Sequence, residues 1–435
     1  MDGSIMQVRR RLFYAILVLA ALRLFYAVPL PGIRMEAWKS LAAADVSSGF
    51  FRLLSGTERT RYSLMALNIT PYITAGIVMQ LLGTCSERIH EMQRGRRQEQ
   101  NRMKRITAVL GLLLAFSEGF FLVRGYEAQG LFYPETEYTP LLAAGAMTAG
   151  TGLSILAGNR IQKRYGYNGS SFIILMNLLA SYPSGVQELY ETVLRGNGID
   201  RQLLFGAGLA GGVVLLFALT YVLQETEKRL PVCYADARFG GGESGSEGYF
   251  PVKLCPGGVV PVIFASTILG IPSLFAGAAG QTAEGTQPFW QRLLSSSCWF
   301  RPEDPLPTLG ALLYVVLIVI FSFFQAAASL DPAEIAADLS RSGGTVAGIR
   351  PGKTLERYLK RQQRSLILWG ALALSVLSLL PMLLSGLFGL SKTAFFGTSV
   401  IITVGVFCEV RKTLLAEKQN RCYRKRSGEK GGLFS

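Results

Sequence analysis

VSSGFFRLLSGTERTRYSLMALNITPYITAGIVMQLLGT, residues 46–84, is the stretch that decides how the rest of this chain is interpreted. A short amphipathic segment leads through Ser55 and Gly56 into an apolar run, which begins with Pro71 at the spacing of a helix start. The run is short for a lone membrane span, which needs roughly 20 apolar residues. Interrupted backbone is tolerated at membrane depth only where it lines a cavity or is packed within protein. The stretch is therefore either a half-inserted plug before a pore-lining helix or an extramembrane loop before an ordinary span.

The whole chain has the composition of a helical membrane protein. Half of its 435 residues are hydrophobic, and 48 are glycine, which lets membrane helices approach one another closely. The predicted fold class is an all-α polytopic membrane protein with ten transmembrane helices. The candidate spans are about residues 12–30, 67–84, 105–123, 141–158, 170–187, 203–223, 257–277, 308–330, 364–386 and 394–410.

The positive charge follows this topology. Roughly three quarters of the 44 Lys and Arg residues lie in the N-terminus, in the loops after even-numbered spans and in the C-terminal tail. Because cytoplasmic loops carry the excess of Lys and Arg, both termini are predicted to be cytoplasmic. The basic N-terminus resembles a secretory signal, but no good cleavage site precedes Pro29, so it is interpreted as an uncleaved first span.

The sequence does not indicate a metal site or a nucleotide site, and no enzyme activity or cofactor is predicted. The six Cys residues form no close pair, and the single His, His90, lies in a basic loop. Residues 352–354 read Gly-Lys-Thr, but the glycine that a phosphate loop requires five residues earlier is missing. Ionisable residues inside spans are functional-site hypotheses by default. Here they are Arg23, Glu118 and Glu409, and Arg23 is a potential partner of Glu118.

Ten spans divide into an N-terminal half, residues 1–195, and a C-terminal half, residues 196–435. Since five is odd, the two halves are inserted in opposite orientations, as in an inverted repeat with its functional site between the halves. The second half carries a basic tail and two cytoplasmic loops, 225–256 and 331–364. In the latter, Asp331 and Pro332 predict a helix start. Farther along, a turn at residues 348–352 projects Arg350.

Six motifs, taken in order, resemble the SecY family, the pore subunits of the bacterial protein translocase. They cover nearly the whole chain: PLPGI at 29–33, NITPYITAGIVMQLL at 68–82, GRR at 95–97, PVKLCPGGVVPVIFAS at 251–266, DPAEIAADLSRSGGTVAGIRPG at 331–352 and FGTS at 396–399. The resemblance implies a clamshell of two inverted five-helix halves around an hourglass pore. A ring of aliphatic side chains at the constriction of that pore grips the passing polypeptide.

The resemblance also implies a role for individual residues. The pore ring and its neighbouring turns fall on Ile69, Ile73, Ile77, Ile174, Ile263 and Ile402. The plug is implied at about residues 46–66, with Phe50, Phe51, Leu53, Leu54, Ser55 and Gly56. A lateral gate, with Gln80 and Asn168 near it, is expected between the second and third spans and the seventh and eighth. Contact with the motor ATPase SecA or the ribosome is expected at Arg341, Arg350, Pro351, Gly352 and Lys353.

The implied partners are the small membrane subunits SecE and SecG, SecA, the ribosome, signal peptides, unfolded preproteins and membrane lipid. The implied location is the bacterial cytoplasmic membrane. One departure from the family concerns the loop before the seventh span, which is usually basic. Residues 240–248 here carry only Glu243 and Glu247 as charges, which weakens the case for ribosome docking and leaves an accessory, specialised translocase open.

Two other classes of function are alternatives to a protein-conducting channel. A secondary solute transporter also uses inverted repeats and broken helices, but it should place convergent polar groups at the middle of the membrane. The spans offer only Arg23, Glu118 and Glu409 for that purpose. A structural insertase scaffold without a pore would have no use for an apolar ring.

Overall fold

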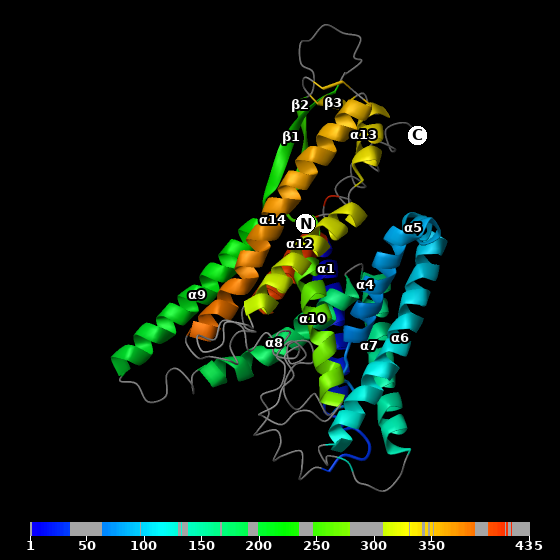
Figure 1. Ribbon diagram of the computed structural model, residues 1–435, viewed down its shortest axis with the longest axis vertical. Helices are drawn as coiled ribbons and strands as arrows, with labels where there is room; N and C mark the ends of the chain where they lie inside the picture. Colours follow the sequence, from blue (N-terminus) through cyan, green and yellow to red (C-terminus); the bar gives the residue numbers. More distant parts are fainter. Residues whose placement is uncertain are drawn as a thin grey trace.

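The computed structural model is a tall bundle of helices with a small β sheet at one end (Figure 1). The structure describes residues 2–34, 63–128, 132, 138–189, 199–234, 247–278, 308–329, 331–387, 399–413, 415 and 419, except for positions 96, 166, 167, 342, 343, 347, 348 and 351. The predicted plug side chains from Phe50 to Gly56 lie outside these residues.

Long helices account for most of the described chain. They are α1 (Asp2–Phe25), α4 (Thr70–Cys85), α6 (Arg97–Ala128), α7 (Thr139–Tyr165), α8 (Gly169–Leu189), α9 (Ile199–Glu225), α10 (Val260–Ala278), α12 (Thr308–Ser329) and α14 (Lys353–Leu387). Two shorter helices are α5 (Glu87–Arg94) and α13 (Pro332–Arg341). A further helix covers residues 399–413 near the C-terminus.

Each of the ten predicted spans overlaps one of these helices. Four described helical segments, within residues 98–127, 139–164, 308–341 and 353–383, are long and apolar enough to cross a membrane. Shorter apolar helical segments occur within α1, α8, α9 and α10. The mostly helical membrane fold is therefore confirmed, and the count of ten crossings stays a prediction.

A three-stranded antiparallel sheet lies outside the helical bundle, in the two segments predicted to be cytoplasmic loops, 225–256 and 331–364. Its strands are β1 (Glu227–Tyr234), β2 (Glu247–Lys253) and β3 (Gly344–Val346), in the order β2-β1-β3. Proline disfavours central strands because it has no N–H to donate. Pro251 lies on the edge strand β2, and Pro231 precedes the part of β1 that β3 covers, so both prolines are tolerated.

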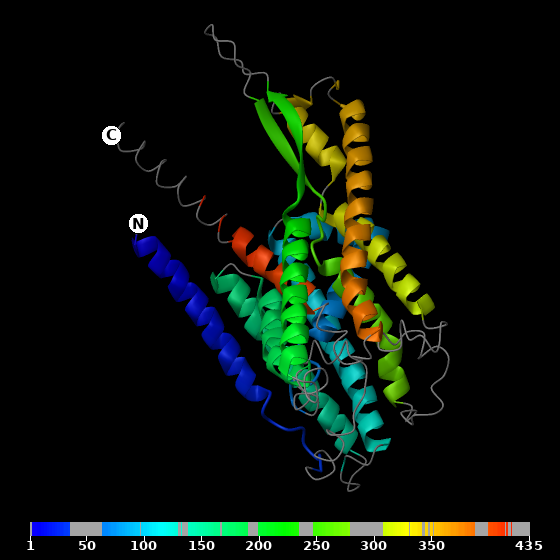
Figure 2. The same cartoon turned by 90° about the vertical axis from the view of Figure 1, so that its left-hand side faces the viewer.

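The sheet and the adjoining helices share a hydrophobic core of their own. Leu230, Val232, Val252 and Val346 point from the sheet, and they pack against buried residues of α13 and of the first turns of α14. α14 then continues without a break from this region into the bundle, which Figure 2 shows from the side. A single continuous helix therefore connects the sheet end to the membrane part.

Two predicted helix starts are confirmed. Pro71 occupies the first or second position of α4, and Pro332 is the first residue of α13. The backbone N–H of Ala333 donates to the Asp331 carboxylate at 3.0 Å, so Asp331 caps α13.

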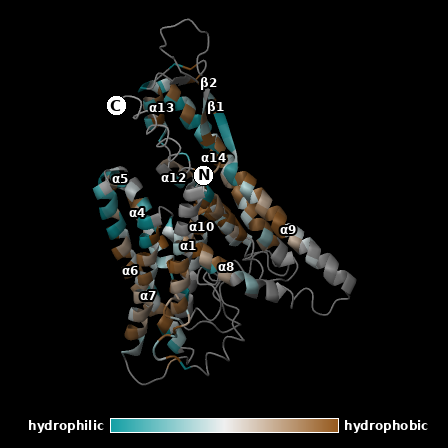
Figure 3. Ribbon diagram, turned by 180° about the vertical axis from the view of Figure 1, so that it is seen from behind, coloured by the Kyte–Doolittle hydropathy of each residue, from teal (hydrophilic) through white to brown (hydrophobic). Residues whose placement is uncertain are grey.

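The hydropathy of the surface agrees with a membrane setting. Figure 3 shows hydrophobic residues along the long helices, and hydrophilic residues at α5, α13 and β1. Large apolar side chains such as Val214, Leu312 and Val376 are more than 60% exposed. So many exposed large apolar side chains are rare on soluble monomers and are typical of contact with lipid.

Candidate functional site

All six isoleucines predicted for the pore ring lie in one hydrophobic cluster. Ile69, Ile77, Ile174, Ile263 and Ile402 are buried members of it, and the half-buried Ile73 packs against it. They come from four helices that are far apart in the sequence: α4, α8, α10 and 399–413. The set therefore lies within one large buried core, to which helices of both predicted halves contribute.

The spacing along α4 explains why three of these isoleucines share one face. Ile69 is the residue before α4, and Ile73 and Ile77 follow at intervals of four residues, which is close to one turn of an α-helix. Ile69 is 1% exposed and Ile77 is 3% exposed. Asn68, just before this face, adopts a left-handed φ of 51°, a conformation that Asn tolerates better than most residues.

Hydroxyl groups near the cluster are satisfied within their own helices. The Thr267 hydroxyl donates to the Ile263 carbonyl at 2.8 Å, and the Thr74 hydroxyl donates to the Thr70 carbonyl at 3.2 Å. The Ser266 hydroxyl donates to the Val262 carbonyl at 2.8 Å. The protons of these hydroxyls are therefore engaged in local hydrogen bonds.

The seam between α8 and the helix 399–413 is held by polar side chains. Glu409 accepts hydrogen bonds from the Asn168 amide at 2.9 Å and from the Ser171 hydroxyl at 2.8 Å. Farther along, the hydroxyls of Tyr182 and Thr403 lie 2.8 Å apart. The sequence did not predict these contacts. The one available signal was that Glu409 is an ionisable residue inside a predicted span, which made it a candidate functional residue.

A second seam between the predicted halves involves α10. This helix packs against α6 and, over a smaller area, against α4. Gln80 is a half-buried residue of α4, whereas Asn168 contacts Glu409 at the other seam. Of the two residues predicted near a lateral gate, Asn168 therefore lies at the seam between α8 and the helix 399–413.

The other ionisable residues inside predicted spans do not form one polar site. The Arg23 guanidinium lies 4.8 Å from the centre of the Tyr26 ring. In the part of the chain that the structure describes, no ion pair joins Arg23 to Glu118, whose carboxylate has one buried oxygen without a hydrogen-bond partner. Within the same residues, no group of His, Cys, Asp and Glu could hold a metal ion.

The predicted contact region for a motor lies at the N-terminal end of α14, beside the sheet. Arg341, Arg350, Gly352 and Lys353 are exposed, and Pro351 lies outside the described residues. Gly352 has a φ of 103°, which L side chains rarely adopt, so glycine is required at this turn. The turn leaves the Arg350 side chain exposed at the sheet end of the molecule.

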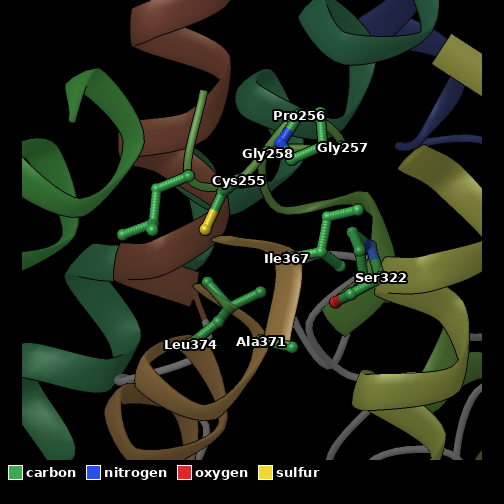
Figure 4. A pocket seen from close by; sticks show the side chains of 10 residues that line it. Cys255, Pro256, Gly257, Gly258, Ser322, Ile367, Ala371 and Leu374 are labelled. Carbon is green, nitrogen blue, oxygen red and sulfur yellow. The ribbon is translucent and has the colours of Figure 1, made fainter. Parts of the chain in front are cut away.

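The connection from β2 into α10 is tightly packed between neighbouring helices. Figure 4 shows a small pocket there, lined by Cys255, Gly257 and Gly258 of the connection and by Ser322, Ile367, Ala371 and Leu374 of α12 and α14. A Cβ atom on Gly370 would lie 2.3 Å from the Leu254 carbonyl oxygen. One on Gly405 would lie 2.5 Å from a methyl of Val259. Glycine therefore lets two helices close around this connection.

Comparison of the sequence with known proteins shows similarity to one family. The family model described as SecY matches residues 63–411. The protein translocase subunit SecY of Thermus thermophilus is 31% identical, over 97% of this chain and 95% of the relative. That of Streptococcus gordonii is also 31% identical, over 94% of each chain.

Solved structures agree on the fold. A structure described as a protein conducting channel superposes with a TM-score of 0.62 at 18% identity, covering 94% of this chain and 92% of that one. Sec61 from the canine ribosome-channel complex gives a TM-score of 0.61, also at 18% identity and with the same coverage.

Proposed function

This chain belongs to the SecY family of protein translocase subunits, and on that premise we propose that its central isoleucine cluster is the constriction of the channel. As a member of this family, it is a protein-conducting channel subunit of a membrane and not an enzyme by itself. The observation that supports the proposed constriction is that Ile69, Ile77, Ile174, Ile263 and Ile402, from four helices, all belong to one buried hydrophobic cluster.

An aliphatic constriction suits a pore that must pass polypeptides and block ions. Its side chains offer no hydrogen bonds to ions or water, so a narrow ring of them loses its water and seals. Aliphatic side chains also carry no fixed charge or hydrogen-bonding pattern that would select among passing sequences. In this proposal residues 46–66 form the plug on one side of the ring.

The two seams have different chemistry, and this supports different roles. The seam between α8 and 399–413 carries the hydrogen bonds of Glu409 and of Tyr182 with Thr403. We propose that it stays closed. The seam where α10 meets α4 and α6 is then the one that opens laterally toward lipid, so that membrane segments of a substrate can leave the pore.

The motor is proposed to dock at the sheet end. Arg350 is exposed there on a glycine-dependent turn, and a projecting guanidinium suits an acidic protein surface or an RNA phosphate. The acidic residues in 240–248 favour SecA over the ribosome as the partner. In this proposal the sheet end and both chain termini lie on the cytoplasmic side. The host membrane is the bacterial cytoplasmic membrane. The small subunits SecE and SecG complete the channel.

Reconstitution tests this proposal. The chain, SecE and SecA are placed in liposomes with ATP and a signal-bearing precursor, and protease-protected precursor is measured. We expect ATP-dependent protection that requires both SecA and the signal. Protection with ribosomes alone would overturn the choice of motor, and the absence of protection with either motor would overturn the channel proposal.

A further inference from the structure

The sheet joins α9 through a single residue. α9 ends at Glu225, and β1 begins at Glu227. The intervening Thr226 donates its N–H to the Val222 carbonyl at 2.9 Å, and its carbonyl accepts the N–H of Leu254, just after β2, at 3.1 Å. Figure 2 shows the two strands rising directly from the end of α9, all in green. A displacement of the base of the sheet therefore acts directly on the end of α9.

The helix 399–413 packs against α9 along one stripe of side chains. Its buried residues in this contact are spaced four apart: Val400, Val404 and Cys408. They lie in one cluster with Leu216 of α9 and share a face, because four residues are close to one helical turn. Lys412 continues the same spacing, and its Nζ atom lies 3.3 Å from the Glu225 carboxylate. The stripe that faces α9 therefore ends in an ion pair at the base of the sheet.

A second stripe of the same helix faces the core. Ile402 and Val406, one turn apart, are buried in the isoleucine cluster. Farther along this side, Glu409 accepts hydrogen bonds from Asn168 and Ser171 at the start of α8. One helix therefore connects the isoleucine cluster and the seam with α8 to the base of the sheet.

The charges at the base of the sheet make Glu225 important for this contact. Burial, followed by the neighbouring Lys412 ammonium, lowers the pKa of Lys253, the last residue of β2. The carboxylates of Glu225 and Glu227 act in the opposite direction. One oxygen of the Glu225 carboxylate is buried, so water screens its charge incompletely. Glu225 therefore offsets the repulsion between a lysine of the sheet and a lysine of the helix 399–413.

A second contact joins the same two helices near this end. The Arg411 guanidinium donates a hydrogen bond to the Tyr221 hydroxyl of α9, and it lies 5.6 Å from the centre of the Tyr221 ring. Because this contact and the apolar stripe remain when the ion pair is removed, we expect such variants to keep the packing of the two helices.

We propose that Lys412 is a positioning residue, whose ion pair with Glu225 transmits docking of the motor at the sheet to the helix that carries Ile402. About ten residues, or roughly 15 Å of helix, separate Lys412 from Ile402. A shift of the base of the sheet then moves the helix 399–413 and changes the position of Ile402 in the constriction. This inference rests on the motor docking and the constriction of the proposed function, and it adds the element that couples them.

A fluorescent reporter on the helix 399–413 tests the coupling. Phe407 is 53% exposed, so Phe407→Cys can carry an environment-sensitive fluorophore, in a background whose native cysteines other than the buried Cys408 are replaced. The full chain with SecE in liposomes is titrated with SecA and a non-hydrolysable ATP analogue. We expect a SecA-dependent shift in emission, which Lys412→Gln and Glu225→Gln each reduce about two- to fivefold, the range for a partly exposed ion pair. An unchanged shift in both variants would overturn the proposal.

Matched variants separate positioning from a general loss of charge. The exchange Glu225→Lys/Lys412→Glu restores an ion pair of reversed sign and should recover the shift. Arg124→Gln breaks the ion pair with Glu127 on α6 and should leave the shift unchanged. If the exchange variant unfolds at the normal temperature but does not recover the shift, Lys412 does not act through Glu225.

Translocation kinetics separate coupling from docking. Lys412→Gln should lower the maximal rate of SecA-driven translocation about two- to fivefold without raising the SecA concentration that gives half of that rate. A raised half-maximal concentration would mean that Lys412 binds the motor itself, and it would overturn the proposal. If the unmodified chain shows neither a SecA-dependent shift nor translocation, the motor assignment of the proposed function fails, and the coupling fails with it.

Discussion

The amide of Asn168 donates a 2.9 Å hydrogen bond to the carboxylate of Glu409, although 241 residues separate them in the chain. Ser171 donates to the other carboxylate oxygen. Hydrogen bonds to a charged group are about twice as strong as neutral ones. The contact therefore stabilises the packing of the first predicted half against the last predicted span of the second half.

A double-mutant cycle measures the coupling free energy between Asn168 and Glu409. Asn168→Ala and Glu409→Ala should each lower the thermal unfolding temperature, and the two effects should be non-additive with a coupling of about 1 kcal/mol. Glu91→Ala, at an exposed position of α5, is the control and should have little effect. Fully additive losses would mean that the two side chains do not interact.

Close packing around the β2–α10 connection gives a second prediction. Gly370→Ala should lower the free energy of unfolding by about 1–3 kcal/mol, because its Cβ would lie 2.3 Å from the Leu254 carbonyl oxygen, and overpacking is costly. Gly211→Ala on α9 meets no atom within 4 Å and should be neutral or mildly stabilising. Equal effects of the two substitutions in chemical unfolding would contradict the packing described for this connection.

Charge reversal at the exposed turn gives a third prediction. Arg350→Glu should abolish SecA-driven export, because it puts a negative charge where an acidic surface is proposed to dock, while membrane insertion of the chain stays normal. Arg102→Glu reverses an equally exposed cation at the start of α6 and should preserve export. Export assays with both variants check this, and normal export by Arg350→Glu would refute the role of the turn.

The apolar cluster gives a fourth prediction, on ion leak. Ile263→Thr should raise resting ion conductance in planar bilayers several-fold, because a hydroxyl lets water enter a constriction that is otherwise dry. The control Val214→Thr alters a side chain on α9 that is 68% exposed and should not change conductance. An unchanged conductance in the Ile263 variant would count against its place in the constriction.

Local sequence signals predicted the helical part of this protein well. Pro71 and Pro332 each start a helix, as expected, because proline fits the first helical turn. The sheet was not predicted, because residues 225–256 and 331–364 were interpreted only as cytoplasmic loops. The pairing in three dimensions shows that Pro231 and Pro251 each lie where no N–H is needed.

The candidate site was predictable only in part. The regular spacing of Ile69, Ile73 and Ile77 predicted a shared face on α4. The partnership of Asn168 and Ser171 with Glu409 could not be predicted, because side chains from distant helices meet only through the tertiary packing of α8 against residues 399–413. Arg23 was only a potential partner of Glu118, and in the structure its guanidinium lies over the Tyr26 ring. A neighbouring aromatic ring on the same chain segment offered a cation a closer partner.

The central claim is that a translocating polypeptide passes the isoleucine cluster, and disulfide trapping tests it most directly. Single cysteines replace Ile174, Ile263 or Ile402 in a background without the six native cysteines. A precursor with one cysteine in its mature part is stalled during SecA-driven translocation and then oxidised. We predict disulfide adducts at all three positions, and none at lipid-facing Leu215→Cys or Leu312→Cys. Adducts at the lipid-facing positions with none at the three isoleucine positions would contradict the account.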